Sequence, residues 1–240
     1  MRTTRIVSVI GVLMCLPSPG HAGLFDSLSE TIAPPSAEHP GDTTLISGLK
    51  QALTIGTENA VNSVSKVNGY MGNKAIKILL PKKIQKAADI LSSLGYQDEV
   101  DAFILSMNRA AEKAAPQAVS FFVDAIKEMT FEDAKKILNG GDTAATQFFE
   151  SKTRDRLYDA FKPIVSSSMN EVGVTHAYRE MIGKYTSAVP FAGIPSLDLD
   201  DYVTTKSLDG LFYMVGQEEK QIRTDPAARV TDTLKKVFGN

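Results

Sequence analysis

The chain has 240 residues, of which 43% are hydrophobic and 22% charged, and its formal net charge is −2. This length is enough for one sizeable hydrophobic core or at most two small ones. The slightly acidic balance predicts no basic patch. We therefore expect neither a nucleic acid nor an anionic lipid surface as a partner.

The first 22 residues have the order of a secretory signal peptide. Two arginines precede an apolar run over residues 6–16, and small residues follow at Gly20 and Ala22. The apolar run is too short to cross a bilayer, which takes roughly 20 residues. We expect cleavage before Gly23, export to the periplasm or the extracellular space, and no membrane span in the mature protein.

The sequence contains a single cysteine, Cys15, which lies inside this leader. A mature chain cut before Gly23 then has no disulfide and no cysteine-based metal site. The competing interpretation is lipid attachment at Cys15, for which Met14 is a poor small-residue neighbour. Without the two arginines of the leader, the chain carries 24 basic and 28 acidic residues and stays mildly acidic.

Residues 23–44 form an N-terminal segment that ends in a linker. The stretch APPSAEHPGD, residues 33–42, is rich in proline and polar residues, and such a composition does not fold alone. From residue 45 onward apolar residues recur at helical spacing, which predicts a single-domain, all-α bundle over residues 45–240. About nine or ten helices are expected, over residues 45–67, 81–94, 97–115, 117–129, 130–139, 143–151, 154–172, 174–187, 200–223 and 226–239.

One stretch, NKAIKILLP, departs from the helical period. Its residues Ile76, Ile78 and Leu80 alternate with less apolar neighbours, as in a β-strand. The bundle therefore has room for one short extended segment over residues 74–80.

Other residues mark where helices begin, bend and end. Thr130 is an expected N-cap, with Asp133 in the first turn of the helix that follows. Pro163 predicts a kink, because proline lacks the N–H that a helix interior needs. Residues 187–201 form a loop long enough to act as a lid or to bind a ligand.

Several longer motifs point to a known family. They are IKILLP, MNRAAEKAAPQA, MTFEDAKKILNGGDTAATQFF, LDDYVTTKSLDGLF and EEKQIRTDPAARVTDTLKKVFG. In this order they resemble the bacterial family called domain of unknown function 4197, from about Leu24 to Gly239. The resemblance implies an exported, mostly helical protein, and it supplies no activity, cofactor or catalytic residue.

Metal and nucleophile chemistry find little support in the sequence. The mature chain has two histidines, His39 and His176, and neither has a partner at ligand spacing. No calcium loop, no G-x-S-x-G turn and no glycine-rich phosphate loop is present. The acids Asp198, Asp200 and Asp201 suit a helix N-terminus, where negative charge is favourable. We therefore expect no metal, no cofactor and no catalytic residue.

One polar cluster lies on the helix over residues 97–115. Helical spacing puts Asn108 beside the apolar stripe and pairs Arg109 with Glu112 three residues later. Leu105 lies on the same side as Arg109, which favours partial burial of that arginine. These three polar residues are candidates for a structural charge network or for a ligand site.

Glu219 is the second candidate. It follows Leu208 by eleven positions, which places it about 20° from the line of the apolar stripe. An unpaired carboxylate facing a core costs several kcal/mol, so we expect a partner. Arg223, four residues further, is the expected one, and Arg109 is the alternative. A structural ion pair, simple solvent exposure and a ligand or catalytic site all remain open.

Together these observations favour an exported helical binding or interaction module without catalysis. Its partner would be another protein or a small apolar ligand. One alternative is a small enzyme with a carboxylate base in a cleft under the loop over residues 187–201. A second is a carrier of an apolar ligand, because a helix such as that over 117–129, apolar on several sides, can line a cavity.

Overall fold

The structure is a computed structural model, and it describes residues 40–171, 173–189, 197–225 and 235. These residues belong to one compact unit, His39–Asn240. The expected leader over residues 1–22 lies outside the described residues, as does nearly all of the last expected helix, over 226–239. Of the loop over 187–201 that the sequence offers as a lid, residues 190–196 lie outside the described part.

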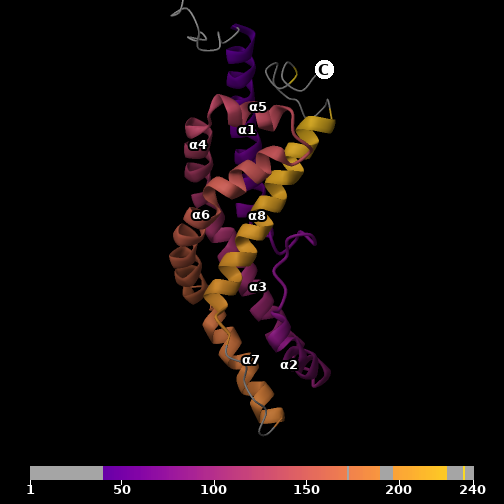
Figure 1. Cartoon of the computed structure of the whole chain (residues 1–240). Helices are drawn as coiled ribbons and strands as arrows, with labels where there is room; N and C mark the ends of the chain where they lie inside the picture. The colour runs from indigo at the N-terminus through magenta and orange to yellow at the C-terminus, as the bar shows by residue number, and fades with distance from the viewer. Residues whose placement is uncertain (1–39, 172, 190–196, 226–234, 236–240) are drawn as a thin grey trace, which may run out of the picture. The chain divides into compact units, whose positions relative to one another are not determined.

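The described residues form α-helices and one short 3₁₀ turn, with no β-strand among them (Figure 1). The all-α class is therefore confirmed. The elements are α1 Pro40–Ser65, α2 Lys82–Ser93, α3 Gln97–Ala114, η1 Ala115–Gln117, α4 Ala118–Glu128, α5 Phe131–Leu138, α6 Ala144–Glu171, α7 Val174–Ala188 and α8 Leu199–Thr224.

The expected count of nine or ten helices is not matched, because eight α-helices occur in the part of the chain that the structure describes. The helices expected over residues 143–151 and 154–172 are one helix, α6. Pro163 lies inside α6 with an exposed ring, so it removes a backbone hydrogen bond without ending the helix. The first helix also begins at Pro40, inside the expected linker.

The alternation at Ile76, Ile78 and Leu80 does correspond to alternate burial, since all three side chains are buried. Leu79 between them is 59% exposed. No strand forms here, because the neighbour of this segment is a side chain rather than a second strand. Asn108 on α3 accepts from the Ile78 N–H at 2.8 Å and donates to the Ile78 C=O at 2.9 Å.

The core lies between the long helices. Helix α8 packs against α6 and α1, and α3 packs against α6 and α7 (Figure 1). The stripe expected on α2 is confirmed, since Ile84, Ala87, Ala88 and Leu91 are buried. Aromatic rings fill the centre, where the centroid of Phe122 lies 5.2 Å from that of Phe149 and 6.0 Å from that of Phe212.

Helix α4 is less buried than its sequence suggests. One face, formed by Ala118, Phe122, Ala125 and Ile126, is buried, whereas its other side is half-buried or exposed. None of the described helices is both long and apolar enough to cross a membrane.

Candidate functional site

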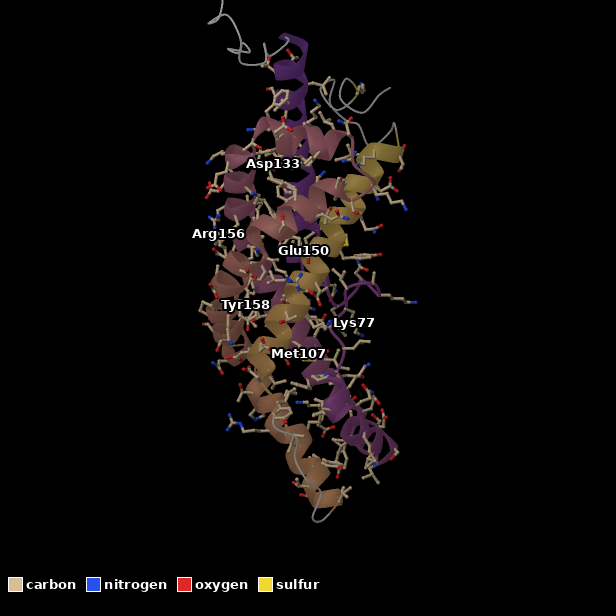
Figure 2. The ribbon with its side chains drawn as sticks, viewed as in Figure 1. Lys77, Met107, Asp133, Glu150, Arg156 and Tyr158 are labelled. Carbon is tan, nitrogen blue, oxygen red and sulfur yellow. The ribbon has the colours of Figure 1, made fainter. Side chains whose placement is uncertain are left out.

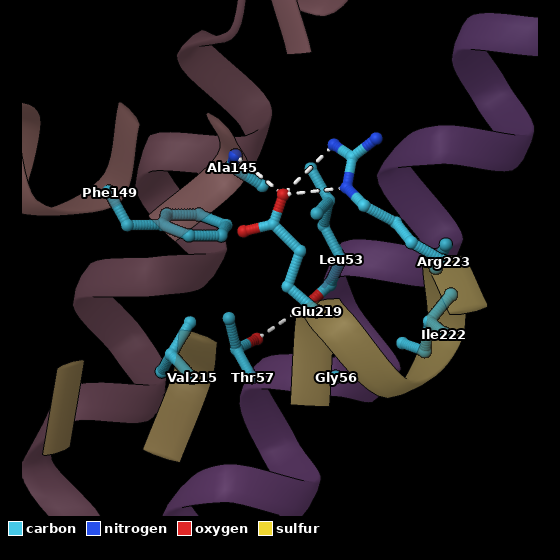
Figure 3. Close-up of a pocket in the computed structure, with 10 residues that line it drawn as sticks. Leu53, Gly56, Thr57, Ala145, Phe149, Val215, Glu219, Ile222 and Arg223 are labelled. Atoms are coloured by element: carbon cyan, nitrogen blue, oxygen red, sulfur yellow. Dashed lines mark hydrogen bonds and ion pairs between the residues drawn. The ribbon is translucent and has the colours of Figure 1, made fainter. Parts of the chain in front are cut away.

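Glu219 lies inside the bundle, on the face of α8 that carries the apolar stripe. It is 7% exposed, and it lies between Val215 and Ile222, which are also buried. The helical count therefore places this carboxylate correctly. What the sequence does not show is the element that covers it, which is the N-terminus of α6 (Figure 3).

Both carboxylate oxygens of Glu219 accept hydrogen bonds from α6. Oε1 accepts from the backbone N–H of Ala145 at 2.9 Å. Oε2 accepts from the backbone N–H of Thr146 and from its hydroxyl, both at 2.8 Å. The first N–H groups of a helix have no partner within the helix and carry the positive end of its dipole. Glu219 therefore caps α6 from a helix distant in sequence.

Arg223 completes this cluster. Its Nε donates to Oε1 of Glu219 at 2.9 Å, and its second guanidinium nitrogen donates to the C=O of Ile137 at 2.8 Å. Ile137 lies in the last turn of α5, where carbonyls lack helical partners and cations are favourable. The Glu219–Arg223 pair thus joins the end of α5, the start of α6 and α8.

A small cavity lies beside the pair, lined by Leu53, Gly56, Phe149 and Val215 together with Glu219 and Arg223 (Figure 3). Its volume is about 20 Å³, which is room for one water molecule. A lipid or another apolar ligand does not fit there.

The second cluster, on α3, holds the chain between α1 and α2. Oε1 of Glu112 accepts from the N–H of Tyr70 at 3.1 Å and from that of Met71 at 3.3 Å. Oε2 pairs with Arg109 at 2.5 Å, and Arg109 also donates to the side chain of Asn68 at 2.9 Å. Glu112 is 4% exposed, so this carboxylate is also an internal cap.

Four of the five candidate residues therefore form two separate pairs, and the fifth, Asn108, bonds to the backbone of Ile78 and Ile104 instead. Arg223 is the arginine beside Glu219, whereas Arg109 lies against Glu112. Tyr70 connects the Glu112 cluster to α8, the helix that carries Glu219. Its N–H donates to Glu112, and its hydroxyl donates to the C=O of Ser207 on α8 at 2.6 Å. Ser207 precedes Glu219 by twelve residues, which is about 18 Å along the helix.

Tyr70 is a residue that sequence reasoning missed. It is fully buried, and burial raises the pKa of its hydroxyl well above the usual range, with a further contribution from Glu112. Gly210 on α8 makes room for the ring, since a Cβ there would lie 2.6 Å from Cε1 of Tyr70. A tyrosine in the turn-rich segment NGYMGN gives no local signal of such burial.

Comparison with known proteins gives one finding. A family model described as a protein of unknown function, DUF4197, matches residues 39–239. The chain belongs to this family. The DUF4197 match begins at His39, where the compact unit begins, rather than at Leu24 as the sequence motifs suggested. Searches of curated proteins and of solved structures found no match.

The geometry of this DUF4197 domain limits what the site can do chemically. Among the described residues, no group of three or more His, Cys, Asp or Glu side chains is placed to hold a metal ion. The expected cleft under the loop over 187–201 cannot be placed, since residues 190–196 lie outside the described part. The acids Asp198 and Asp201 serve α8, where the Asp198 side chain accepts from the Asp201 N–H at 2.9 Å.

Proposed function

We propose that this domain is a non-catalytic module that acts by binding another molecule, and that its two buried charge clusters hold the fold together. One observation supports this most strongly. All four carboxylate oxygens of Glu112 and Glu219 accept hydrogen bonds from the protein itself. A general base needs a lone pair directed at the substrate proton. Glu219 accepts four hydrogen bonds, which use its four acceptor sites, and the three bonds that Glu112 accepts all come from the protein around it.

The alternative functions have less support. An enzyme with a base under the loop over 187–201 would need a residue other than Glu219, whose oxygens face α6. A carrier of an apolar ligand would need an enclosed cavity of several hundred Å³, whereas the cavity beside Glu219 has about 20 Å³. The surface, by contrast, carries open grooves along α8.

We also propose that the module acts after export. The order of arginines, apolar run and small residues before Gly23 supports a cleavable leader. The intact mass of the exported protein tests this: a chain starting at Gly23 is expected, and a retained Cys15 carrying lipid would contradict it.

Chemical crosslinking in the native cell envelope tests the binding function. We expect a small number of recurrent adducts, identified by mass spectrometry. The double variant Glu219→Leu with Arg223→Leu should give the same adducts, because the pair lies inside the fold. Absence of any recurrent adduct would contradict a binding role. Loss of adducts from a double variant that still folds would show that the pair itself contacts the partner.

A further inference from the structure

The surface around the α1–α2 connection is basic. Residues 59–88 contain six lysines and no acidic residue, although the whole chain has a net charge of −2. The expectation of no basic patch is therefore wrong for this stretch. Lys77 lies in the middle of it, on the segment between α1 and α2 (Figure 2), and the other lysines are Lys66, Lys74, Lys82, Lys83 and Lys86, all exposed.

A groove of about 410 Å³ runs between this segment and α8. Residues 75–79 form one wall, and Tyr202, Lys206 and Tyr213 contribute to the other. Leu79 and Tyr213, both in the groove, are large side chains with 59% and 46% exposure. The groove thus combines apolar and aromatic side chains, which are enriched at protein interfaces, with nearby positive charge.

One acidic residue, Asp209, also lines the groove, but its charge is already paired. Its carboxylate accepts from Lys206 at 2.9 Å and from Arg154. Partial burial opposes ionisation of Asp209, yet the bonds from Arg154 and Lys206 outweigh burial and lower its pKa. The charged residues that line the groove are Lys77, Lys206 and the paired Asp209, so the lining carries a net positive charge.

The backbone along the groove has an open edge. Both polar groups of Ile78 point to Asn108, which requires an extended chain. In an extended chain the polar groups of Lys77 and Leu79 point the other way. The Lys77 N–H donates to Asn73 and the Leu79 C=O accepts from Tyr202.

Of the backbone polar groups of these two residues, the Lys77 C=O and the Leu79 N–H have no hydrogen-bond partner among the described residues. These two groups have the spacing at which one residue of a parallel strand pairs with its neighbour.

We propose that this groove binds an extended acidic peptide segment, which pairs with the Lys77 C=O and the Leu79 N–H as an added strand. The proposal rests on the binding function proposed above and names its partner class. Addition of a strand to an open edge is a common way of binding peptides, in which backbone bonds give affinity and alternate side chains give specificity. Apolar side chains of the peptide would contact Leu79 and Tyr213, and its carboxylates would face the lysines.

An anionic membrane surface is the competing partner for six lysines. It would use their charge and leave the groove and the backbone edge unused. The open edge between apolar side chains favours a peptide, and the two partners predict different results in the experiment below.

The test uses the mature, isotope-labelled protein and two capped eight-residue peptides. One alternates glutamate and valine, and the other alternates glutamate and proline. They have the same charge, but proline lacks the N–H needed for strand pairing. We expect the valine peptide to shift the backbone amide signal of Leu79 in NMR spectra. It should bind about tenfold more tightly than the proline peptide.

Three variants sharpen the test. Leu79→Pro removes the N–H and tolerates an extended chain, and we expect it to lower affinity about tenfold relative to Leu79→Ala, which keeps that group. Lys77→Glu should lower affinity about fivefold. Lys127→Glu makes the same charge change on α4, outside the groove, and should change affinity less than about twofold.

Several results would overturn the proposal. Equal affinity for both peptides, or equal effects of Leu79→Pro and Leu79→Ala, would show that charge alone attracts the probe. A membrane partner would give a different pair of results. Vesicles containing anionic lipid would bind Leu79→Pro and Leu79→Ala equally, and the valine peptide would shift no amide signal of residues 77–80. None of these results would remove crosslinked adducts, so they leave the binding function itself intact. Circular dichroism shows whether each variant folds. The NMR comparison of the two peptides uses the unmodified protein, so it tests the proposal even if a variant fails to fold.

Discussion

Glu219 occupies a position on α8 at which its helical neighbours along the stripe are valine and isoleucine. Its burial is stabilised by two backbone N–H groups, one hydroxyl and one guanidinium, which together replace the water that the carboxylate loses. Glu112 on α3 uses the same chemistry toward Tyr70 and Met71. Both acids therefore cap backbone that other elements leave unsatisfied.

The sequence allows part of this to be predicted. The stripe through Leu208 and Val215 indicates that Glu219 is turned inward, and the four-residue spacing indicates Arg223 as its partner. The partners Ala145, Thr146 and Ile137 could not be predicted, because helical periodicity does not specify which helix ends meet in space. The basic stretch over 59–88 could have been predicted from the sequence, but the net charge of the whole chain does not reveal it.

The contact between Tyr70 and Gly210 leads to a prediction about a single methyl group. Gly210→Ala should lower the free energy of unfolding by about 1 to 3 kcal/mol, because the new Cβ would lie 2.6 Å from Cε1 of the fully buried Tyr70 ring and 3.1 Å from Cβ of Ile76. The measurement is denaturant unfolding at constant temperature.

Gly183 on α7 is the matched control. It is an exposed helical glycine, and a Cβ there meets nothing within 4 Å. Gly183→Ala should raise the free energy of unfolding by about 0.5 to 1 kcal/mol, since alanine favours the helix. The same sign for both substitutions would contradict the packing described for Tyr70.

Helix α5 shows a complete local signal. The stretch TFED predicts an N-cap at Thr130, and the structure confirms it. The Thr130 hydroxyl accepts from the Asp133 N–H at 3.1 Å, and the Asp133 carboxylate accepts from the Thr130 N–H at 3.2 Å. A capping box of this kind involves only four consecutive residues, which is why the sequence alone predicts it.

Thr130 lowers the pKa of Asp133 below its usual value of 3.8, chiefly through the hydroxyl and then through the backbone N–H. The carboxylate contribution to stability is therefore complete above pH 3.8 and is lost as pH falls through the lower pKa of the folded state. Thr130→Ala should cost about 1 kcal/mol near neutral pH. It should also raise the pKa of Asp133 in an NMR titration.

Thr130→Ser keeps the hydroxyl and serves as the control, with the pKa of Asp133 still low. The stability difference between wild type and Thr130→Ala should shrink as the pH is lowered below 3.8. A difference that grows in acid would contradict the capping box as its source.

Two sequence patterns correspond to the structure only in part, for physical reasons. The sequence predicted separate helices over residues 143–151 and 154–172, with a kink at Pro163 in the second, yet α6 is one helix that includes nearly all of both ranges and continues through Pro163, whose ring is exposed. Ile76, Ile78 and Leu80 suggested a strand, and their burial alternates as in one. The missing strand partner is the amide of Asn108, which mimics a peptide group. The local sequence pattern around Ile78 could not predict that a side chain 30 residues away takes the place of a neighbouring strand.

In the whole domain, α8 is the helix to which both clusters attach. Tyr70, held by Glu112, contacts α8 at Ser207, while Glu219 and Arg223 join its far end to α5 and α6. The polar residues that first suggested a site are thus used inside the fold. The groove proposed above as a peptide site lies between residues 75–79 and the same helix.

A double-mutant cycle on Glu219 and Arg223 tests most directly that this pair is structural. Glu219→Leu should destabilise by about 3 kcal/mol in denaturant unfolding, because two backbone N–H groups lose their acceptor and the largely buried Arg223 guanidinium loses the carboxylate that balances its charge. Adding Arg223→Leu should recover at least about 1 kcal/mol, since the lone charge is then gone. Glu218→Leu, one residue away, should change stability by less than about 0.5 kcal/mol. A double variant as unstable as the sum of its single variants, or all variants within about 0.5 kcal/mol of wild type, would contradict the account.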